Sequence, residues 1–400
     1  MDIRPFTGNF TQQEPIGDDA IAAAVDVLKG GRLHRYNTAS GEVSQAALLE
    51  ADYAAYQGVE YCLACASGGY AMGIALRAAG VTQGEPVLTN AFTLAPVPGA
   101  IAGAGARPVL VEITRDLTLD LGDLEKKIRS SGARFMLLSN MRGHLTDMDT
   151  LTALLEHHSV TLIEDCAHTM GSTWSGRRSG NFGLAGCFST QTYKHLNSGE
   201  GGILTSDDPQ FMARAIVLSG SYMLYERHGA APPSQYFSTV RLETPNLSGR
   251  MDNLRAAILR PQITGLDANI ARWNERYRAL EEQLAQTPGV YVPHRPDQEG
   301  IVGSSFQFLF PGVSAQSAQT LVSDALSLGV ELKWFGAERP VGFTSRHQSW
   351  QYLEPAQLPQ TDEILAGLFD MRIPLTFSVA DCRHIGAILD HCLRRGSYVA

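Results

Sequence analysis

The chain has 400 residues, of which 44% are hydrophobic and 18% are charged, and its formal net charge is −9. The length predicts about two domains and the composition an ordinary globular protein, while the acidic balance argues against nucleic acid as the main partner. Neither a membrane-spanning apolar run nor an apolar targeting segment is recognised, so we expect a cytoplasmic protein that does not contact membranes.

The first predicted elements lead to a segment of mixed polarity. Residues 18–28 predict a helix that stops at Gly30. Residues 32–41 are too irregular for a helix. Tyr36, within this segment, has two interpretations: a side chain in a solvated loop, or a contact to a substrate.

A glycine pair follows the first predicted strand. Residues 61–64 predict the strand, Gly68 and Gly69 a turn after Ser67, and residues 70–79 an apolar helix. Such a turn points free backbone N–H groups at a phosphate, although its spacing matches neither a dinucleotide-binding loop nor a P-loop. The pair is therefore a candidate phosphate cradle, with a plain turn as the alternative.

An aromatic residue follows the next strand, and the alternation of strands and helices then continues. Phe92 comes after the strand at residues 86–88, and its ring either stacks on a flat ligand or packs in the core. Further strands are predicted at 108–111, 135–138 and 160–163, and helices at 121–130 and 148–157. This pattern predicts an α/β fold with a mostly parallel sheet and helices on both faces.

The strand at 160–163 leads into the residues that carry the chemistry. It ends at Glu164 and Asp165, and Ser189 and Lys194 follow, before a glycine cluster at 199–202. A strand-end carboxylate, a hydroxyl, a lysine and a glycine cluster are the parts that hold pyridoxal phosphate as a Schiff base. An Asp partner favours the protonated pyridine nitrogen, so Asp165 is the candidate for that contact.

Lysines and cysteines are both few. Of the five lysines, only Lys194 is flanked by glycine, serine and aromatic residues in a setting typical of a site. Cys62 and Cys65 form a single C-x-x-C on a predicted buried strand, where neighbouring side chains face opposite sides. We expect structural thiols there and no metal site.

Several motifs now resemble one known family. E-D-C-A-H-T-M-G, C-F-S-T-Q-T-Y-K and G-E-G-G, at residues 164–171, 187–194 and 199–202, resemble the signatures of the DegT/DnrJ/EryC1/StrS sugar aminotransferases, which are fold-type I pyridoxal-phosphate enzymes. Weaker similarities at residues 50–58, 143–149 and 372–376 extend over most of the chain.

The resemblance implies roles for individual residues. Lys194 would form the Schiff base and carry the proton, Gly68, Gly69 and Ser189 would hold the phosphate, and Phe92 would stack on the ring. His168 occupies a position where the family commonly has Gln and would contact the ring oxygen, with a structural histidine as the alternative.

The segment after residue 218 is expected to serve a second subunit. Residues 219–245 are polar and contain two adjacent prolines, which is typical of a binding loop or a partner-contacting arm. The resemblance implies a homodimer with shared active sites, in which an Asn reaches the partner's phosphate. Asn246 and Ser248 are both candidates for that contact, and Arg250 is a candidate substrate contact.

A long amphipathic run, residues 252–284, leads to the C-terminal part. There we predict strands at 289–292, 306–310 and 330–333, and helices at 317–328 and 379–393. We therefore expect a large pyridoxal-phosphate-binding α/β domain at residues 1–255 and a smaller α+β domain at residues 256–400.

These observations predict a pyridoxal-phosphate-dependent aminotransferase. By resemblance, the donor is glutamate or glutamine, and the acceptor a keto-sugar, often nucleotide-linked, or a cyclitol ketone. A dehydratase or other elimination enzyme using the same cofactor, and a cofactor-binding regulatory protein, are the alternatives. A nicotinamide dehydrogenase is disfavoured because the G-x-G-x-x-G loop is missing.

Overall fold

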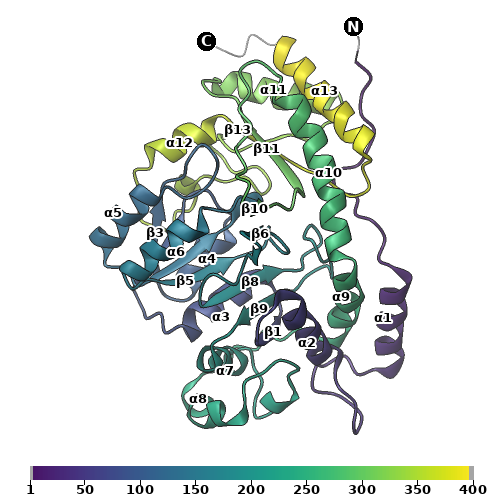
Figure 1. The fold of residues 1–400 in the computed structure, drawn as a ribbon, viewed down its shortest axis with the longest axis vertical. Coiled ribbons are helices and arrows are strands. Elements are labelled where there is room, and N and C mark those ends of the chain that lie inside the picture. Colours follow the sequence, from purple (N-terminus) through teal and green to yellow (C-terminus); the bar gives the residue numbers. More distant parts are fainter. Residues whose placement is uncertain (1–2, 396–400) are drawn as a thin grey trace.

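A computed structural model of the chain describes residues 3–395, with a seven-stranded sheet at its centre (Figure 1). The strand order is β1-β9-β8-β5-β4-β2-β3, and neighbours are parallel except that β9 runs antiparallel to β1 and β8. The bounds are β1 Tyr61–Cys65, β2 Pro86–Asn90, β3 Arg107–Val111, β4 Phe135–Ser139, β5 Thr161–Asp165, β8 Ala185–Ser189 and β9 Gly202–Ser206. The predicted mostly parallel sheet is confirmed.

Alternate residues of these strands pack into two different cores, because successive side chains of a strand point to opposite faces. In β1, Leu63 and Cys65 belong to one core, and Cys62 and Ala64 belong to the other. The two cysteines of the C-x-x-C sequence therefore lie on opposite faces of the sheet, each as a buried free thiol. They pack as small apolar side chains.

Helices cover both faces of the sheet (Figure 1). The core on one face includes residues of α3 (Gly68–Ala78), α4 (Pro96–Gly103) and α7 (Pro209–Leu218). The cores on the other face include residues of α2 (Gln45–Gln57), α5 (Leu121–Ser131), α6 (Met148–His157) and α9 (Asn253–Thr264). The first helix, α1 (Asp18–Gly30), packs on α9, outside these layers.

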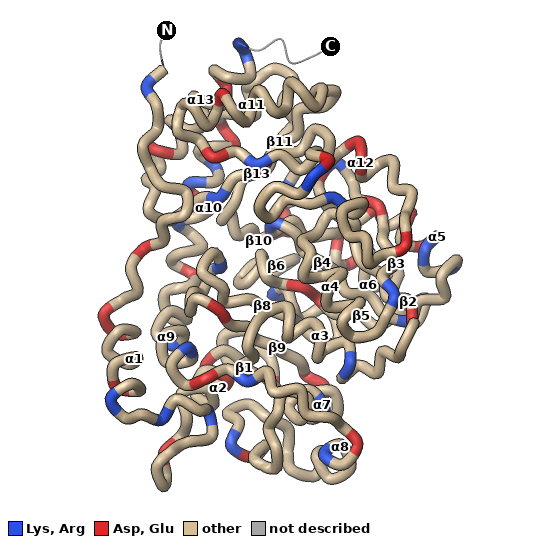
Figure 2. The backbone as a smooth tube through the Cα atoms, turned by 180° about the vertical axis from the view of Figure 1, so that it is seen from behind, with Lys and Arg blue, Asp and Glu red and all other residues tan. Residues whose placement is uncertain are grey.

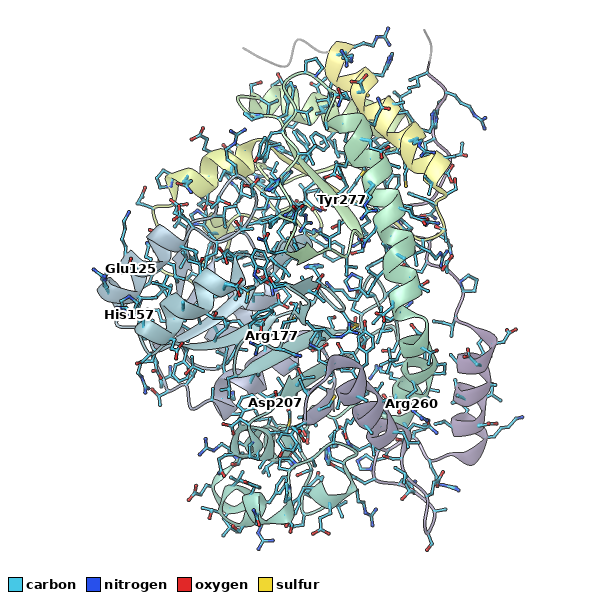
Figure 3. The ribbon with its side chains drawn as sticks, viewed as in Figure 1. Glu125, His157, Arg177, Asp207, Arg260 and Tyr277 are labelled. Carbon is cyan, nitrogen blue, oxygen red and sulfur yellow. The ribbon has the colours of Figure 1, made fainter. Side chains whose placement is uncertain are left out.

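The C-terminal part contains a second, antiparallel sheet of order β11-β13-β12. Its strands are β11 Ser305–Leu309, β12 Lys333–Trp334 and β13 Leu368–Arg372, and the helices around it are α10 Leu266–Leu284, α11 Ala315–Ser327, α12 Pro359–Ala366 and α13 Val379–Arg395. Tyr277 of α10 points toward the sheet, and its ring centroid lies 5.1 Å from that of Phe306 (Figure 3).

Both ends of the chain contribute to the core of this C-terminal part. Phe6 and Phe10 pack in it beside Phe377, with ring centroids 4.9 Å from that of Phe377 in both cases. In contrast, the buried residues of α9 pack with α2 and β1 of the large sheet. The division at residues 255 and 256 remains a prediction, and the chain before α1 also packs with the smaller part.

Three predictions about single elements are corrected by the structure. The run at residues 252–284 is broken at Gly265 into α9 and α10. The strand expected at 289–292 is reduced to an isolated bridge between Tyr291 and Leu309. The expected arm at 219–245 includes the helix α8 (Phe237–Glu243), whose Phe237 is fully buried in the core that also contains α7 residues.

The remaining elements are short. A small sheet joins β10 Glu299–Gly300, β6 Thr173–Trp174 and β7 Arg177–Arg178, and 3-10 turns lie at η1 Met141–Gly143, η2 Tyr225–Arg227, η3 Ser234–Tyr236 and η4 His347–Ser349. Basic and acidic residues are interspersed along the backbone (Figure 2). Within residues 3–395, no helix has both the length and the apolar character needed to cross a membrane.

Candidate active site

The carboxyl ends of the parallel strands border a cavity of about 780 Å³. Ser139, Asp165 and Ser189 are the last residues of β4, β5 and β8, and all three line it. Ligands of open α/β sheets bind at this edge, where neighbouring strands deliver their side chains together. Ser305 and Arg372 of the C-terminal sheet also line the cavity, so both parts of the chain form its walls.

Lys194 lines this cavity from the loop that follows β8. Its Nζ lies 2.9 Å from Nε2 of His168. Burial lowers the pKa of Lys194 from 10.5 to about 7; Asp165 partly opposes this shift, and Arg142 and Arg372 add to it. A lysine with such a pKa carries a large fraction of neutral amine at neutral pH, and the neutral amine is the form that attacks an aldehyde.

Asp165 offers a buried carboxylate to the same cavity, with 6% of its surface exposed. The hydroxyl of Ser139 donates to its Oδ2 over 3.1 Å, and the N–H of Ala167 donates to its Oδ1 over 3.1 Å. Burial raises the pKa of Asp165, while these hydrogen bonds and the charge of Lys194 pull it down. The carboxylate is thus oriented and able to pair with a positively charged partner in the cavity.

The neighbouring acid, Glu164, has a different task, because adjacent strand residues face opposite sides of a sheet. Its carboxylate is fully buried and accepts hydrogen bonds from the N–H groups of Gly180, Phe182 and Gly183, over 2.9, 2.8 and 3.1 Å. Glu164 therefore stabilises the loop before β8, and Asp165 alone of the acidic pair lines the cavity.

His168 lines the cavity beside the lysine. Burial, followed by the charge of Lys194, holds the pKa of His168 well below its usual range. Its ring is therefore neutral at neutral pH, and Nε2 can accept a hydrogen bond from Nζ of Lys194. This contact suits His168 to orient the amine of Lys194 and the oxygen of a ligand bound beside that amine.

The start of α3 carries the glycine pair, whose role as a phosphate cradle remains a prediction. The side chain of Ser67 caps the helix by accepting from the N–H of Tyr70 over 3.0 Å, and Gly68 and Gly69 line the cavity. A Cβ on Gly68 would lie 2.9 Å from Cβ of Ser189. Glycine thus lets the helix N-terminus and the Ser189 hydroxyl approach each other, and together they fit a phosphate group.

A sequence profile of the DegT/DnrJ/EryC1/StrS aminotransferase family matches residues 15–390. The chain belongs to this family. The resemblance found in the motifs at residues 164–171, 187–194 and 199–202 is thereby confirmed over nearly the whole chain.

Relatives within the DegT/DnrJ/EryC1/StrS family include two curated proteins. A pleiotropic regulatory protein of Geobacillus stearothermophilus is 32% identical over 58% of this chain and 58% of its own length. An L-glutamine:2-deoxy-scyllo-inosose aminotransferase of Streptomyces lividus is 31% identical over 70% of this chain and 65% of its own length. The matched region thus spans about three-fifths of the length of these relatives.

A solved structure shares the fold over the whole chain. The crystal structure of 3-amino-5-hydroxybenzoic acid synthase superposes with a TM-score of 0.82, covering 98% of this chain and 100% of that one, at 22% identity. Its agreement with the present structure confirms the fold-type I architecture of this member of the DegT/DnrJ/EryC1/StrS family.

Phe92, expected to stack on the ring, lies elsewhere in this DegT/DnrJ/EryC1/StrS family member. It is 1% exposed, packs edge-on against Phe335 at 5.2 Å between ring centroids, and does not line the cavity. The adjoining wall is formed by Leu94, Ala95 and Pro96. The structure therefore corrects this expectation and supports the core-packing interpretation of Phe92.

Tyr36 also lies outside the cavity. Its hydroxyl is 2.8 Å from Nε2 of His228, and Nδ1 of the same ring is 2.9 Å from Arg35, which pairs with the buried Glu50. Tyr36 is 5% exposed, so neither a solvated loop nor a contact in this cavity describes its position. It belongs to a buried polar network.

The residues assigned to a partner subunit lie away from this chain's own cavity. Oδ1 of Asn246 accepts from the N–H and the hydroxyl of Ser248 over 3.0 and 3.1 Å, and both residues are exposed. Arg250 donates to the carbonyl oxygen of Gly220 over 2.9 Å. Their contacts across a dimer, and the substrate contact of Arg250, remain predictions.

Three of the polar lining residues that the sequence reasoning missed bear on the chemistry of the site. Ser139 orients Asp165, Arg142 adopts a φ of 56° in η1, and Arg372 ends β13. A hydroxyl at the end of a parallel strand is a signal for Ser139, because the Asp165 assignment rested on the same kind of position. Arg142 reaches the cavity in the turn that follows β4, whereas only the packing of the C-terminal sheet brings Arg372 there.

Replacing Gly68 with alanine is expected to weaken cofactor binding about tenfold, because the added Cβ crowds Ser189 at the phosphate cradle. The matched control is Gly69→Ala, where the nearest neighbouring atom lies 3.9 Å from the added Cβ. Titration of pyridoxal phosphate into each apo-protein measures both affinities. A Gly68→Ala variant that binds the cofactor as tightly as the wild type does would contradict the cradle.

Proposed function

We propose that the protein is a pyridoxal-phosphate-dependent aminotransferase that moves an amino group from glutamate or glutamine to a keto-sugar or cyclitol ketone. One observation carries the proposal: a lysine with a pKa lowered to about 7, an oriented carboxylate and a helix N-terminus all border one cavity. Few other cofactors require this combination of groups.

The residues present fit the cofactor on chemical grounds. Gly68, Gly69 and Ser189 offer a place for its phosphate, Lys194 an amine for its aldehyde, and Asp165 a carboxylate for its ring nitrogen. When bound, pyridoxal phosphate supplies an electron sink for the electrons released at the donor's α carbon.

The chain's own groups then divide the work. Lys194 Nζ would act first as a general base that takes the proton from the donor's α carbon. It would then act as a general acid that gives the proton back later in the amino transfer. His168, neutral because of its burial, holds Nζ at 2.9 Å through Nε2, and it would donate to an oxygen on the ring only as the tautomer with its proton on Nε2, when Nζ no longer donates to it. Asp165, oriented by Ser139, would offer its carboxylate to the ring nitrogen.

The donor and acceptor classes rest on the relatives and on the resemblance. The Streptomyces lividus relative is named for glutamine and for a cyclitol ketone, which supports both classes for this chain. We further propose a homodimer whose sites are shared, with Asn246 or Ser248 reaching the partner's phosphate. Their exposure and their distance from the cavity of their own chain support this arrangement.

The test is steady turnover of glutamine or glutamate with a panel of cyclitol ketones and nucleotide-linked keto-sugars. Formation of the amino product is the quantity measured. Repeated turnover with one of these ketones supports the proposal. The Geobacillus stearothermophilus relative is named as a regulatory protein, so a protein that binds the cofactor but never turns over would favour that second function.

The rate at which Lys194 captures pyridoxal phosphate is expected to rise with pH through about 7 and then to level off. The sign follows from the amine, because only its neutral form attacks the aldehyde, and that form increases as pH rises through the pKa. Stopped-flow absorbance from pH 5.5 to 9 checks this. A rate still rising steeply at pH 9 would show that the pKa stays near its ordinary value of 10.5.

A further inference from the structure

The C-terminal sheet has one apolar and one polar face, because its side chains alternate. Phe306, Phe308, Phe369 and Met371 point into the C-terminal core. The alternate residues, on the opposite face, are paired across the strands: Ser305 with Arg372, Gln307 with Asp370, and Lys333 with Asp370. Ser305 and Arg372 of this polar face line the cavity that contains Lys194.

The polar face carries more positive than negative charge. Arg142 pairs with Oδ2 of Asp370 over 2.8 Å, and Gln307 donates to Oδ1 of the same carboxylate over 2.7 Å. Both oxygens of Asp370 are therefore occupied. Lys333 and Arg372 lie near enough that Asp370 raises the pKa of each, while burial, Arg142 and other charges lower it. One carboxylate, paired with Arg142, thus lies among three cations.

Arg372 is the cation that faces the cavity without an acidic partner. Its guanidinium carbon lies 3.6 Å from the centroid of the Tyr193 ring, and within residues 3–395 no carboxylate pairs with it as a salt bridge. The side chain is half-buried, and burial is the main reason that its pKa is lowered. A partly desolvated guanidinium held over an aromatic ring can present its N–H donors to a carboxylate or phosphate.

The guanidinium of Arg372 lies beside the chain segment that carries Lys194. Tyr193, on which Arg372 rests, directly precedes Lys194 in the chain. Arg142 and Arg372 line the same cavity as Lys194, and the charge of each lowers the pKa of the lysine. In the proposed function Gly68, Gly69 and Ser189 would hold the cofactor's phosphate, so Arg372 is left to bind another anion.

We propose that Arg372, supported by Arg142, binds a carboxylate of the substrate that reacts at Lys194. This inference rests on the proposed function and narrows its substrate class. The carboxylate belongs either to the amino donor or to the keto acceptor. In the second case the acceptor is an acidic ketone, and a neutral sugar is a poor substrate.

The direct test is binding of succinate, a dicarboxylate without a reacting group, to the protein reconstituted with pyridoxal phosphate. Calorimetry of the wild type is expected to show millimolar or tighter binding that weakens with salt. Arg372→Gln should weaken it at least about tenfold, and Arg372→Lys less, because lysine keeps the charge but loses the fork. Arg383→Gln, an exposed arginine of α13, should bind succinate as the wild type does.

Melting temperatures check that Arg372→Gln folds. If it does not fold, the succinate affinity of Arg372→Lys tests the proposal in its place. Equal succinate affinity in the wild type and both Arg372 variants, or no succinate binding to the wild type, would overturn the proposal. Inorganic phosphate is titrated in parallel. Tighter binding of phosphate than of succinate through Arg372 would overturn the choice of a carboxylate.

The two half-reactions separate the donor from the acceptor. If the donor's carboxylate is bound, Arg372→Gln raises the glutamate concentration for half-saturation about tenfold. If Arg372 binds the acceptor's carboxylate instead, the half-reaction of Arg372→Gln with glutamate is unchanged. The rate of amino transfer from this variant to pyruvate then falls relative to the rate of transfer to a neutral cyclitol ketone. An unchanged variant in an active aminotransferase defeats only this inference, whereas Arg372-dependent succinate binding without transamination defeats only the proposed function.

Discussion

Lys194→Ala is expected to lower transamination by at least about ten-thousand-fold, because the variant loses both the covalent attachment of the cofactor and the group that moves the proton. No other lysine of the described residues lines the cavity, so none replaces it there. Mass spectrometry after borohydride reduction, with peptide mapping, measures cofactor capture, and turnover of glutamate measures catalysis.

The variant should keep its fold. The pKa of Lys194 is lower in the folded chain than its ordinary value of 10.5, so between about pH 7 and that value the unfolded chain binds the proton more readily. The lysine therefore disfavours folding most below about pH 7, and this penalty falls as pH rises toward 10.5, so removing the lysine should not lower the melting temperature. Lys126→Ala, an exposed lysine of α5, is the control that keeps full activity. Cofactor captured by a reduced Lys194→Ala protein would contradict the assignment.

Asp165→Asn is expected to lower turnover about a hundredfold to a thousandfold while cofactor capture persists. Asparagine has nearly the same shape but no charge, so the partner of the ring nitrogen is lost and the amine of Lys194 is retained. Because the charge of Asp165 raises the pKa of Lys194, the pH dependence of cofactor capture should also move to lower pH. The wild type and the variant are compared by stopped-flow absorbance.

The control for Asp165 is its neighbour. Glu164→Gln replaces an oxygen that faces backbone N–H groups with an N–H donor, so it should lower the stability of the fold by about 1–3 kcal/mol. It should leave the pH dependence of Lys194 unchanged in the protein that remains folded. A shift of that pH dependence in Glu164→Gln but not in Asp165→Asn would show that the roles of the two acids had been exchanged.

The parts of the site that follow strand ends could be predicted from the sequence. Asp165, Ser189 and the glycine pair after β1 are each fixed by a short strand whose end lies at one edge of a parallel sheet. Parallel strands bring the residues at their carboxyl ends to one edge of the sheet, so local sequence patterns were enough to predict that these residues lie together.

Side-chain direction in loops could not be predicted in this way. Phe92 and Leu94 both follow β2, and both are suitable for a flat ligand or for a core. Only the turn after the strand decides that Leu94 lines the cavity and Phe92 packs on Phe335. Tyr36 was equally ambiguous, because its partners Arg35 and His228 come together only in the folded chain.

Arg372 was missed for a longer-range reason. The alternation of Phe369, Asp370, Met371 and Arg372 is typical of a strand with one polar face. Such a face normally meets water, and only the packing of the C-terminal sheet against the large sheet turns Arg372 toward Lys194. The helix α8 was missed because the sequence around it is polar and contains prolines. Its two buried apolar residues, Phe237 and Val240, do not form a recognisable helical pattern in that context.

The most direct test of the central claim is the absorption spectrum of the protein with pyridoxal phosphate, before and after glutamate or glutamine is added. We predict a visible band of the lysine-bound cofactor that is replaced by a near-ultraviolet band when the amino donor is added. A visible band that neither donor changes, or no band at all, would contradict an aminotransferase built around Lys194.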